Sequence, residues 1–507
     1  MKRDETSTPP AATALCPPTL AELGATSPQK QAVTLIPAGL IHIQYTAFLY
    51  CGASGPLAGP LGCIPIFEKA FQLRGGDLTR TVGMEHGEQN KDERPDRCGK
   101  VALVVAALML TSLALTALGL TAAVAAQNTA TSASDVYAAQ ATAKTESPTS
   151  HVKGKVFDRF VVIWLENTDY TAAVADPNLA WLASKGITLS NYFGVTHPSE
   201  PNYVAAIGGD NFGMDNDNFN QVAGNVSTVV DLLENKGISW SEYQEDMPYS
   251  GFEGFSWVNQ KTGANDYVRK HNPAVIYNAN TNPDRLAKIK NTTVFYEDLK
   301  ANKLPQWMFI TPNMTSDGHD TSVTVAGTWT RNFLEPLLNN KNFMQNTLVL
   351  ITFDENHTYT LANRVMGILL GDAVPSKLHG TTDSTFYDHY SEIATVEANW
   401  GLHTLGRWDV GANVFDLVAK KTGDKNTAWP AVTSANPTRF LNESFPGPFN
   451  SVNSSVPYPV PNSLLFRAGR TVLPKVVLQW GLKQLQQRSY YRNTVQIPDG
   501  LNPPAGW

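Results

Sequence analysis

Cysteine is scarce in this chain and is confined to its first hundred residues. The four cysteines among 507 residues are Cys16, Cys51, Cys63 and Cys98. Residues 99–507 therefore contain no cysteine for a disulfide or for a metal cluster. A cysteine nucleophile is excluded there for the same reason.

Charge is sparse as well, and a basic excess is absent. Only 17% of the residues are charged, and the formal net charge is -6. A protein that follows a phosphate backbone usually carries a basic excess, so the composition gives no support for a nucleic-acid partner. Hydrophobic residues make up 42% of the chain, which predicts a large globular core and argues against a disordered chain.

One uncharged hydrophobic run, Val101–Ala126, is long enough to span a bilayer. It follows the basic sequence RCGK and ends in the Ala-Val-Ala pattern that signal peptidase accepts. A linker rich in Ser, Thr and Ala follows over residues 127–155. We interpret the run as a secretory signal peptide, and a signal anchor is the alternative.

Residues 1–100 precede this run and show no clear periodicity. Because a signal peptide begins its chain, we hypothesise that translation starts at Met84 or Met109. The alternative is a disordered cytoplasmic arm on a type II membrane protein, since basic residues stand before the hydrophobic run. Mass spectrometry of the secreted protein tests the hypothesis, and a peptide from residues 1–83 would contradict it.

Asn-x-Ser/Thr sequons follow the hydrophobic run and agree with passage through a secretory pathway. We predict glycans at four of them, and we expect none at two that lie beside candidate site residues. The predicted carriers are Asn225, Asn291, Asn442 and Asn453, and the excluded sequons are Asn313 and Asn356. Secretion into the medium or to the cell wall is the expected localisation.

Short apolar runs alternate with helical patterns from about residue 157 onward. This order predicts an α/β fold, a three-layer α/β/α sandwich with a mainly parallel central sheet, over residues 156–425. Residues 426–507 are expected to be an irregular C-terminal segment with one helix near 472–487. The expected strands are 157–167, 187–195, 238–246, 305–313, 346–356 and 363–372, and the expected helices are 177–186, 226–237, 328–340, 390–402 and 411–423.

Polar residues follow four of the predicted strands and open one predicted helix. In open α/β sheets, active groups gather at the carboxyl ends of the strands. Carboxylates, histidines and a hydroxyl that converge there are the components of a metal-assisted hydrolase. The clusters are Glu166 and Asn167; His197, Ser199 and Asn202; Asn313, Asp317, His319 and Asp320; Asp354 and Glu355; and, at the helix, Asp388 and His389.

Ser199 has two possible roles. Followed by Glu200 and Pro201, it has the sequence of a helix N-cap, and capping is the stronger interpretation from these residues alone. The same position would also place its hydroxyl at the positive end of the helix dipole, where a phosphoryl group is stabilised. Asn202 would then supply a neutral hydrogen-bond donor to a phosphate oxygen. We expect Ser199 both to cap the helix and to attack phosphorus.

The candidate carboxylates and histidines also have ordinary alternatives. Glu166 alone could be a solvated carboxylate at a strand end, but Asp354 and Glu355 close a second buried strand beside it. Carboxylates that crowd at one edge repel one another unless a cation lies among them. His319 and His389 could be loop histidines, although each has a neighbouring Asp that can orient an imidazole.

The motifs WLEN, THPSEPNY, SDGHD and FDEN, in this order, resemble the phosphoesterase family of secreted fungal acid phosphatases and bacterial phospholipases C. This family belongs to the alkaline phosphatase-like superfamily. The resemblance covers about residues 157–420. It implies that Ser199 is the nucleophile and that His197 and His319 lie near the phosphate, with one of them as general acid. Separately, we predict that Asn202 and His389 bind substrate. The implied metal ligands are Glu166, Asn167, Asp354 and Glu355.

The implied ligand set is rich in oxygen and lacks the several histidines that hold two zinc ions in alkaline phosphatases. It suits one harder divalent cation, whose identity the residues do not fix. The expected activity is that of a secreted acid phosphatase, which hydrolyses small phosphomonoesters through a phosphoserine. The alternatives are a phospholipase C-type phosphodiesterase and a non-catalytic secreted glycoprotein. We expect no nucleic-acid partner and no stable membrane association unless the signal is retained, and the oligomeric state stays open.

Overall fold

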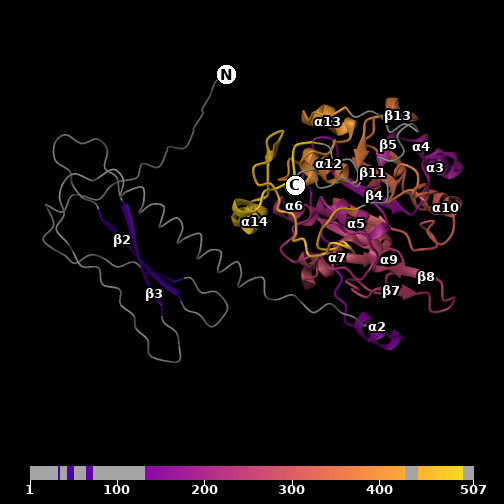
Figure 1. The fold of residues 1–507 in the computed structure, drawn as a ribbon. Helices are drawn as coiled ribbons and strands as arrows, with labels where there is room; N and C mark the ends of the chain where they lie inside the picture. The colour runs from indigo at the N-terminus through magenta and orange to yellow at the C-terminus, as the bar shows by residue number, and fades with distance from the viewer. Residues whose placement is uncertain (1–31, 35–42, 51–63, 72–131, 429–443, 495–507) are drawn as a thin grey trace, which may run out of the picture. The chain divides into compact units, whose positions relative to one another are not determined.

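The computed structural model describes residues 32–34, 43–50, 64–71, 132–428 and 444–494 (Figure 1). The chain divides into two compact units, residues 1–103 and 104–507. The hydrophobic run at 101–126 lies outside the described residues. Among the helices that are described, none combines the length and the apolar character needed to cross a bilayer.

The first unit contains a three-stranded antiparallel sheet in the order β1-β2-β3. Its strands are β1 (Ala32–Thr34), β2 (Ile43–Tyr50) and β3 (Ile64–Phe71).

A nine-stranded sheet forms the centre of the second unit. Neighbouring strands are parallel, except that β12 runs antiparallel to both β11 and β5. In spatial order the strands are β13 (Thr381–Asp383), β5 (Ile187–Phe193), β12 (Arg364–Leu370), β11 (Thr347–Phe353), β4 (Arg159–Leu165), β10 (Trp307–Thr311), β6 (Trp240–Gln244) and β9 (Ile289–Asn291), while β14 (Tyr387–Asp388) also pairs with β5.

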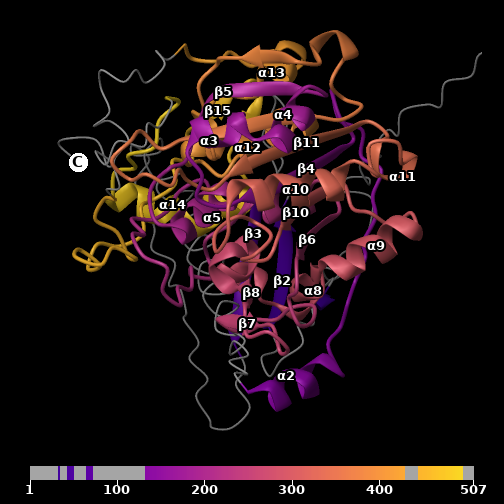
Figure 2. The same cartoon turned by 90° about the vertical axis from the view of Figure 1, so that its right-hand side faces the viewer.

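Helices cover both faces of this sheet, which explains why its central strands are continuous apolar runs. Strands β6, β10 and β11 are buried along their whole length. Figure 1 shows α3, α4 and α10 on one side of β4 and β11, with α5 and α12 on the other, and Figure 2 looks onto the first layer. In chain order, the helices of this part of the second unit are α3 (Tyr170–Ala175), α4 (Pro177–Ala183), α5 (Ser199–Gly208), α6 (Val229–Asn235), α7 (Pro273–Ile276), α8 (Pro283–Leu286), α9 (Thr292–Lys300), α10 (Val323–Leu334), α11 (Lys341–Met344), α12 (Tyr390–Trp400) and α13 (Asp416–Thr422).

The predicted architecture, an α/β fold with a mainly parallel central sheet, is confirmed. The six expected strands correspond to β4, β5, β6, β10, β11 and β12. The helix expected at 328–340 instead occupies Val323–Leu334, because Ser322 takes the N-cap position. The segment between β6 and β10 contains elements that the sequence did not reveal, including α7, α9 and a hairpin of β7 (Ser256–Val258) and β8 (Asn265–Val268).

The described part of the C-terminal segment packs on the rest of the second unit. It contains β15 (Phe466–Arg467), β16 (Arg470–Thr471) and α14 (Pro474–Gln486). Beyond α14, the hydroxyl of Tyr490 donates to Asp210 Oδ2 at 2.9 Å, and the Tyr491 hydroxyl donates to the same oxygen. These bonds hold the segment against the end of α5.

Candidate active site

Two neighbouring strands bring Glu166 and Asp354 together. Strands β4 and β11 are parallel with Phe353 opposite Leu165, so the residues that follow them emerge at the same sheet edge. The backbone N–H of Asn167 donates to Asp354 Oδ1 at 3.1 Å and fixes the two strand ends relative to each other. The sequence order of buried strand and then carboxylate therefore produces a cluster of carboxylates.

Ser199 joins this cluster as the first residue of α5. Its Oγ donates to Glu166 Oε2 at 3.1 Å. The expectation that Ser199 caps its helix is wrong, because Pro198 is the N-cap and no side chain caps the helix. The backbone N–H of Glu200 is also not free, since it donates to Asp217 Oδ1 at 2.9 Å. The hydroxyl therefore points at the carboxylates and not at its own backbone.

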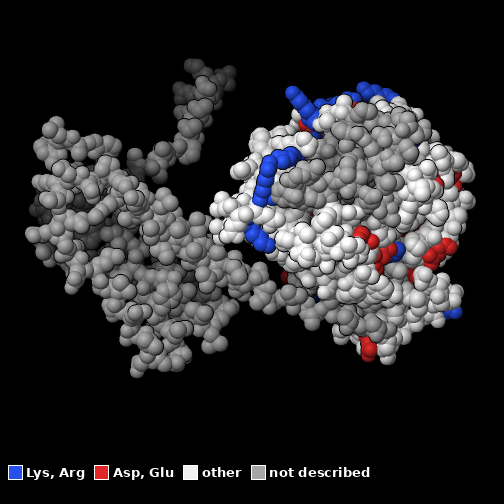
Figure 3. Space-filling model, in the orientation of Figure 1, with Lys and Arg blue, Asp and Glu red and all other residues white. Residues whose placement is uncertain are grey.

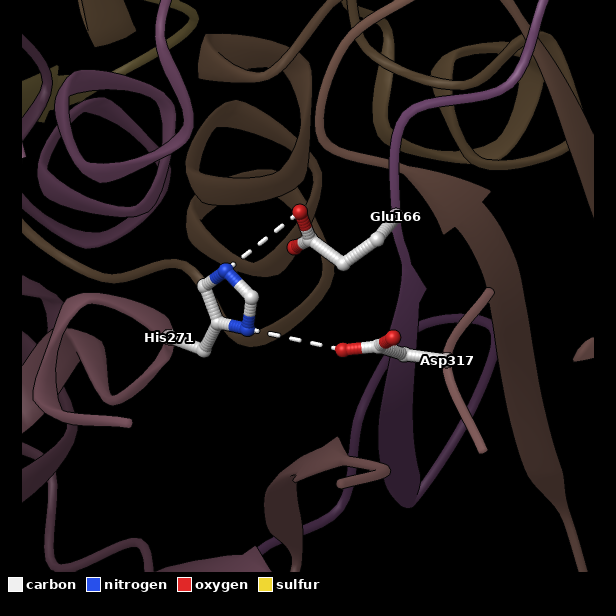
Figure 4. A group of neighbouring side chains, drawn as sticks. All are labelled: Glu166, His271 and Asp317. Atoms are coloured by element: carbon white, nitrogen blue, oxygen red, sulfur yellow. Dashed lines mark ion pairs between the residues drawn. The ribbon is translucent and has the colours of Figure 1, made fainter. Parts of the chain in front are cut away.

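Glu166, His271 and Asp317 form a second group that shares Glu166 with the first (Figure 4). His271 ends a short 3₁₀ helix, and Asp317 lies in the loop after β10. His271 Nε2 lies 3.3 Å from Glu166 Oε2, and His271 Nδ1 lies 3.5 Å from Asp317 Oδ2. All three residues are buried, and their ligand atoms lie within 4.8 Å of one another.

Burial and mutual repulsion make the carboxylates of this site hard to ionise. Burial raises the pKa of Glu166 well above its usual range, and the charges of Asp354 and Asp317 raise it further. Burial likewise raises the pKa of Asp354, with Glu355 adding to the effect. Burial lowers the pKa of His271 well below its usual value, which keeps the imidazole neutral. Neutral imidazole is the form that binds metals.

The polar atoms of the cluster fit a bound cation. Asn167 Oδ1, Asp354 Oδ2, Asp317 Oδ2 and both His271 nitrogens are buried and have no hydrogen-bond partner among the described residues. Buried polar atoms normally have such partners, and a cation bound in this cluster would supply the missing contacts. Glu166, Asn167 and Asp354 are the residues that would hold it, and His271 approaches the same Glu166 oxygen that Ser199 contacts.

Glu355 differs from Asn167 and Asp354, each of which has an oxygen without a hydrogen-bond partner among the described residues, because both Glu355 oxygens already accept hydrogen bonds. Oε1 accepts from Asn167 Nδ2 at 2.9 Å and from the Tyr359 hydroxyl at 3.2 Å. Oε2 lies 2.6 Å from His197 Nδ1. In this structure Glu355 orients Asn167 and His197.

The three predicted histidines lie in different surroundings. His197 is buried against Glu355, and burial lowers its pKa to about 4. His319 lies closer to solvent, with Nδ1 at 2.8 Å from Asp320 Oδ1. His389 is buried, and its Nε2 lies 2.6 Å from the backbone oxygen of Asp354. His389 thus contacts the backbone of Asp354 and not its carboxylate.

The Asn202 amide is engaged by the loop that leads into α5. Its Oδ1 accepts from the backbone N–H groups of Val195 and Thr196, at 2.8 and 3.2 Å. Its Nδ2 donates to the backbone oxygens of Thr196 and Pro198, at 2.8 and 3.1 Å. The side chain fixes the loop that places Ser199. A hydrogen bond from Asn202 Nδ2 to a phosphate oxygen, as predicted, would compete with its bonds to Thr196 and Pro198.

Sequence reasoning missed Lys270, which introduces a positive charge at the site. Its Nζ lies 3.0 Å from Asp217 Oδ2 and 3.4 Å from His319 Nε2. Burial alone would lower the pKa of Lys270, but the charges of Asp217 and Glu166 hold it above the usual value. Lys270 and His271 lie between β8 and α7 in a segment without periodicity, so only their proximity to His319 in the fold reveals them.

The predicted glycosylation sites differ in exposure. Asn453 is exposed and Asn225 is half-buried. Asn291 uses its Nδ2 to bond the backbone oxygen of Met247 at 2.7 Å and its Oδ1 to cap α9. Asn442 lies outside the described residues. Asn453 is therefore the described sequon most open to a glycan.

Known proteins resemble most of this chain. The model of the phosphoesterase family matches residues 150–403. An acid phosphatase of Aspergillus fumigatus is 56% identical over 335 residues, which cover 66% of this chain and 74% of that protein. A probable acid phosphatase of Kluyveromyces lactis is 49% identical over 367 residues, which cover 72% of this chain and 85% of that protein.

More distant relatives are also found. A phosphatidylinositol-3-phosphatase of Mycobacterium tuberculosis is 27% identical over 253 residues, which cover 49% of this chain and 79% of that protein. A solved structure of a protein in the alkaline phosphatase superfamily from Vibrio parahaemolyticus covers 52% of this chain and 73% of its own, at 10% identity and a TM-score of 0.33. That score is too low to support a conclusion about this chain.

Proposed function

The chain belongs to the phosphoesterase family and is a phosphomonoester hydrolase, and from this premise we propose that it is a secreted acid phosphatase with Ser199 as its nucleophile. The observation that carries the proposal is the hydrogen bond of 3.1 Å from Ser199 Oγ to Glu166 Oε2 inside the buried carboxylate cluster. A serine hydroxyl needs a neighbouring group that removes its proton or lowers its pKa before it can attack.

In the first step the Ser199 oxygen attacks phosphorus, and the bond from phosphorus to the ester oxygen breaks. The Ser199 proton passes to Glu166, whose Oε2 already accepts the hydrogen bond from Ser199 Oγ. The product is a phosphoserine and an alcohol. Water then attacks the phosphoserine, and Ser199 recovers its proton as inorganic phosphate leaves.

Glu166, Asn167 and Asp354 are the residues that would hold a divalent cation beside Ser199. When bound, such a cation keeps the carboxylates ionised and offsets negative charge on the phosphoryl oxygens. The orphan polar atoms of the cluster support this assignment.

His319 and Lys270 are placed to receive the phosphate and the leaving group. Lys270 brings a positively charged side chain to the site, and its ammonium group attracts the phosphoryl oxygens. His319 is oriented by Asp320 and lies closer to solvent than His197. We assign His319 the role of general acid for the departing oxygen.

An acid pH optimum follows from this assignment. Burial and the charge of Lys270 lower the pKa of His319 below its usual value. The imidazole carries its proton only at mildly acidic pH and below, so protonation of the leaving group weakens as the pH rises. The carboxylates that bind the cation set the opposite limit, because protons compete with the cation at low pH.

Replacement of the nucleophile tests the proposal. Ser199→Ala should lower kcat for p-nitrophenyl phosphate by about a thousandfold or more, because the attacking oxygen is lost. After acid quenching, mass spectrometry should find phosphoserine at Ser199 in the unmodified enzyme. The matched control is Ser227→Ala, which changes another buried serine outside the site and should leave the activity near normal. Near-normal activity of Ser199→Ala would contradict the assignment.

Small phosphomonoesters are the proposed substrates, and a parallel assay separates the phosphodiesterase alternative. Bis-p-nitrophenyl phosphate and phosphatidylcholine carry a second ester arm that a monoesterase does not need to accommodate. The proposal expects much faster turnover of the monoester than of either diester. The reverse order would assign the chain to phospholipase C-type chemistry.

A further inference from the structure

Helix α14 carries apolar side chains on two opposite faces. Its inner face is anchored by Val476 and Trp480, which are buried. The indole Nε1 of Trp480 donates to the backbone oxygen of Asn225 at 3.1 Å and fixes the rotation of the helix on the domain. A surface helix of a globular protein normally turns polar residues outward. In α14, the outer face is apolar as well.

The outer face is a stripe of three leucines at the i, i+4 and i+7 positions of one helical face. Leu478, Leu482 and Leu485 are 60%, 53% and 83% exposed. We call Leu478, Leu482 and Leu485 the leucine face. Contiguous exposed apolar patches of this kind mark interaction sites.

The segment that carries the leucine face has charged residues of one sign. Residues 444–494 contain no Asp or Glu but six Lys and Arg residues. Three of these cations pair with Asp424 or Asp231. The other three form no ion pair within the described residues, and all are exposed: Lys483, Arg488 and Arg492. In Figure 3, Lys and Arg atoms lie over the side of the molecule that carries α14, and most Asp and Glu atoms lie toward the opposite side.

We propose that the leucine face docks on the surface of an anionic lipid bilayer. Exposed leucines on a helix, in a segment that has no acidic residue and three exposed cations without an ion pair, have the chemistry of an interfacial helix: the apolar side chains enter the acyl boundary and the cations contact anionic headgroups. A second copy of the chain is disfavoured as the occupant. A two-fold symmetric contact would bring the same cations of both copies together. The docking is peripheral and is separate from the hydrophobic run at 101–126.

Hydroxyl-radical footprinting of the unmodified full chain tests the contact directly. Vesicles of phosphatidylcholine with phosphatidylserine should protect Leu478, Leu482 and Leu485 from oxidation, and vesicles of phosphatidylcholine alone should protect them much less. Tyr296 on α9 is 53% exposed and is the internal control, whose oxidation should not change. Equal oxidation of the leucines with and without anionic vesicles overturns the proposal. Protection that grows with protein concentration in the absence of vesicles identifies a second copy and also overturns it.

Substitutions provide the second measurement. The triple variant Leu478→Gln, Leu482→Gln and Leu485→Gln should bind anionic vesicles roughly tenfold more weakly or worse, because buried apolar area drives interfacial binding. Its hydrolysis of a soluble phosphomonoester should equal that of the unmodified chain, which shows that the fold is retained. The control Tyr296→Gln should bind vesicles normally. Unchanged vesicle binding by the triple variant overturns the proposal.

Discussion

At the scale of single residues, α5 contacts both oxygens of one carboxylate. Ser199 and Tyr203 are four residues apart and therefore lie on the same helix face. Ser199 Oγ donates to Glu166 Oε2, and the Tyr203 hydroxyl donates to Glu166 Oε1. The Tyr203 ring also stacks on His271, with centroids 5.0 Å apart. Tyr203 thus orients Glu166 toward Ser199, the proposed nucleophile.

Tyr203→Phe tests this orienting role. The variant should lose about tenfold to a hundredfold in kcat/KM and in cation affinity, which is the usual effect of removing a partner that orients a metal ligand. The measurements are initial rates with p-nitrophenyl phosphate and cation content after dialysis. The control is Tyr243→Phe, because the Tyr243 hydroxyl is also buried but bonds Asp298 at 2.7 Å. Tyr203→Phe with the activity and cation content of the control would show that Glu166 is oriented without Tyr203.

At the scale of secondary-structure elements, Asp231 ties α6 to two other helices. It completes a capping box with Thr228 at the start of α6. It also pairs with Arg285 of α8 at 2.9 Å and with Lys475 of α14 at 2.8 Å. Burial alone would raise the pKa of Asp231, but the charges of Arg285 and Lys475 hold it below the usual value.

This depressed pKa predicts a pH-dependent contribution to stability. Asp231 stabilises the fold fully above the unfolded-state pKa of about 3.9, and the contribution is lost as the pH falls through the lower folded-state pKa. At neutral pH, Asp231→Asn should lower the free energy of unfolding by about 3 kcal/mol, because it leaves Arg285 with less compensation. The difference should shrink when urea unfolding is repeated below the folded-state pKa.

Asp284→Asn is the matched control for this measurement. Asp284 also lies on α8, but its side chain is 81% exposed and its contact to Lys144 is a surface pair. The control should change the free energy of unfolding by about 0.5 kcal/mol or less at every pH. An effect of Asp231→Asn that does not depend on pH would contradict the ion-pair argument.

The elements also show how far the sequence determines the site. The proximity of Glu166 and Asp354 follows from two buried apolar runs that end in carboxylates, since neighbouring parallel strands end at the same sheet edge. No hydrophobic periodicity or motif in the sequence predicts that His271 lies beside Glu166 and Asp317. His271 reaches them because it ends a 3₁₀ turn between a hairpin and a short helix. The cap position was mispredicted because Pro198 adopts the N-cap conformation, and the local sequence favoured Ser199.

At the scale of the whole molecule, the buried carboxylates of the candidate site destabilise the folded protein when they are ionised. Glu166, Asp317 and Asp354 are buried within one cluster, and burial raises the pKa of each. The proposed cation would offset this penalty, because a ligand that binds the folded state and not the unfolded chain stabilises the fold. Chelation at neutral pH should therefore lower the Tm, and addition of the cation should restore it. An unchanged Tm in a sample shown to lose its cation would contradict the assignment.

Asp317→Asn should separate the stability of the cluster from its function. Asp317 Oδ2 has no hydrogen-bond partner among the described residues and faces His271 Nδ1 at 3.5 Å. The substitution removes one repelling charge and places an N–H opposite the neutral imidazole. After chelation, the variant should be about 1–2 kcal/mol more stable than the unmodified chain, while its activity with cation falls. The contrast is Asp298→Asn, which removes the partner of buried Lys290 at 2.6 Å and should destabilise the protein with or without cation. Thermal unfolding with and without chelator measures both effects, and a cation-free Asp317→Asn less stable than the unmodified chain would show that the carboxylates do not repel one another in the folded protein.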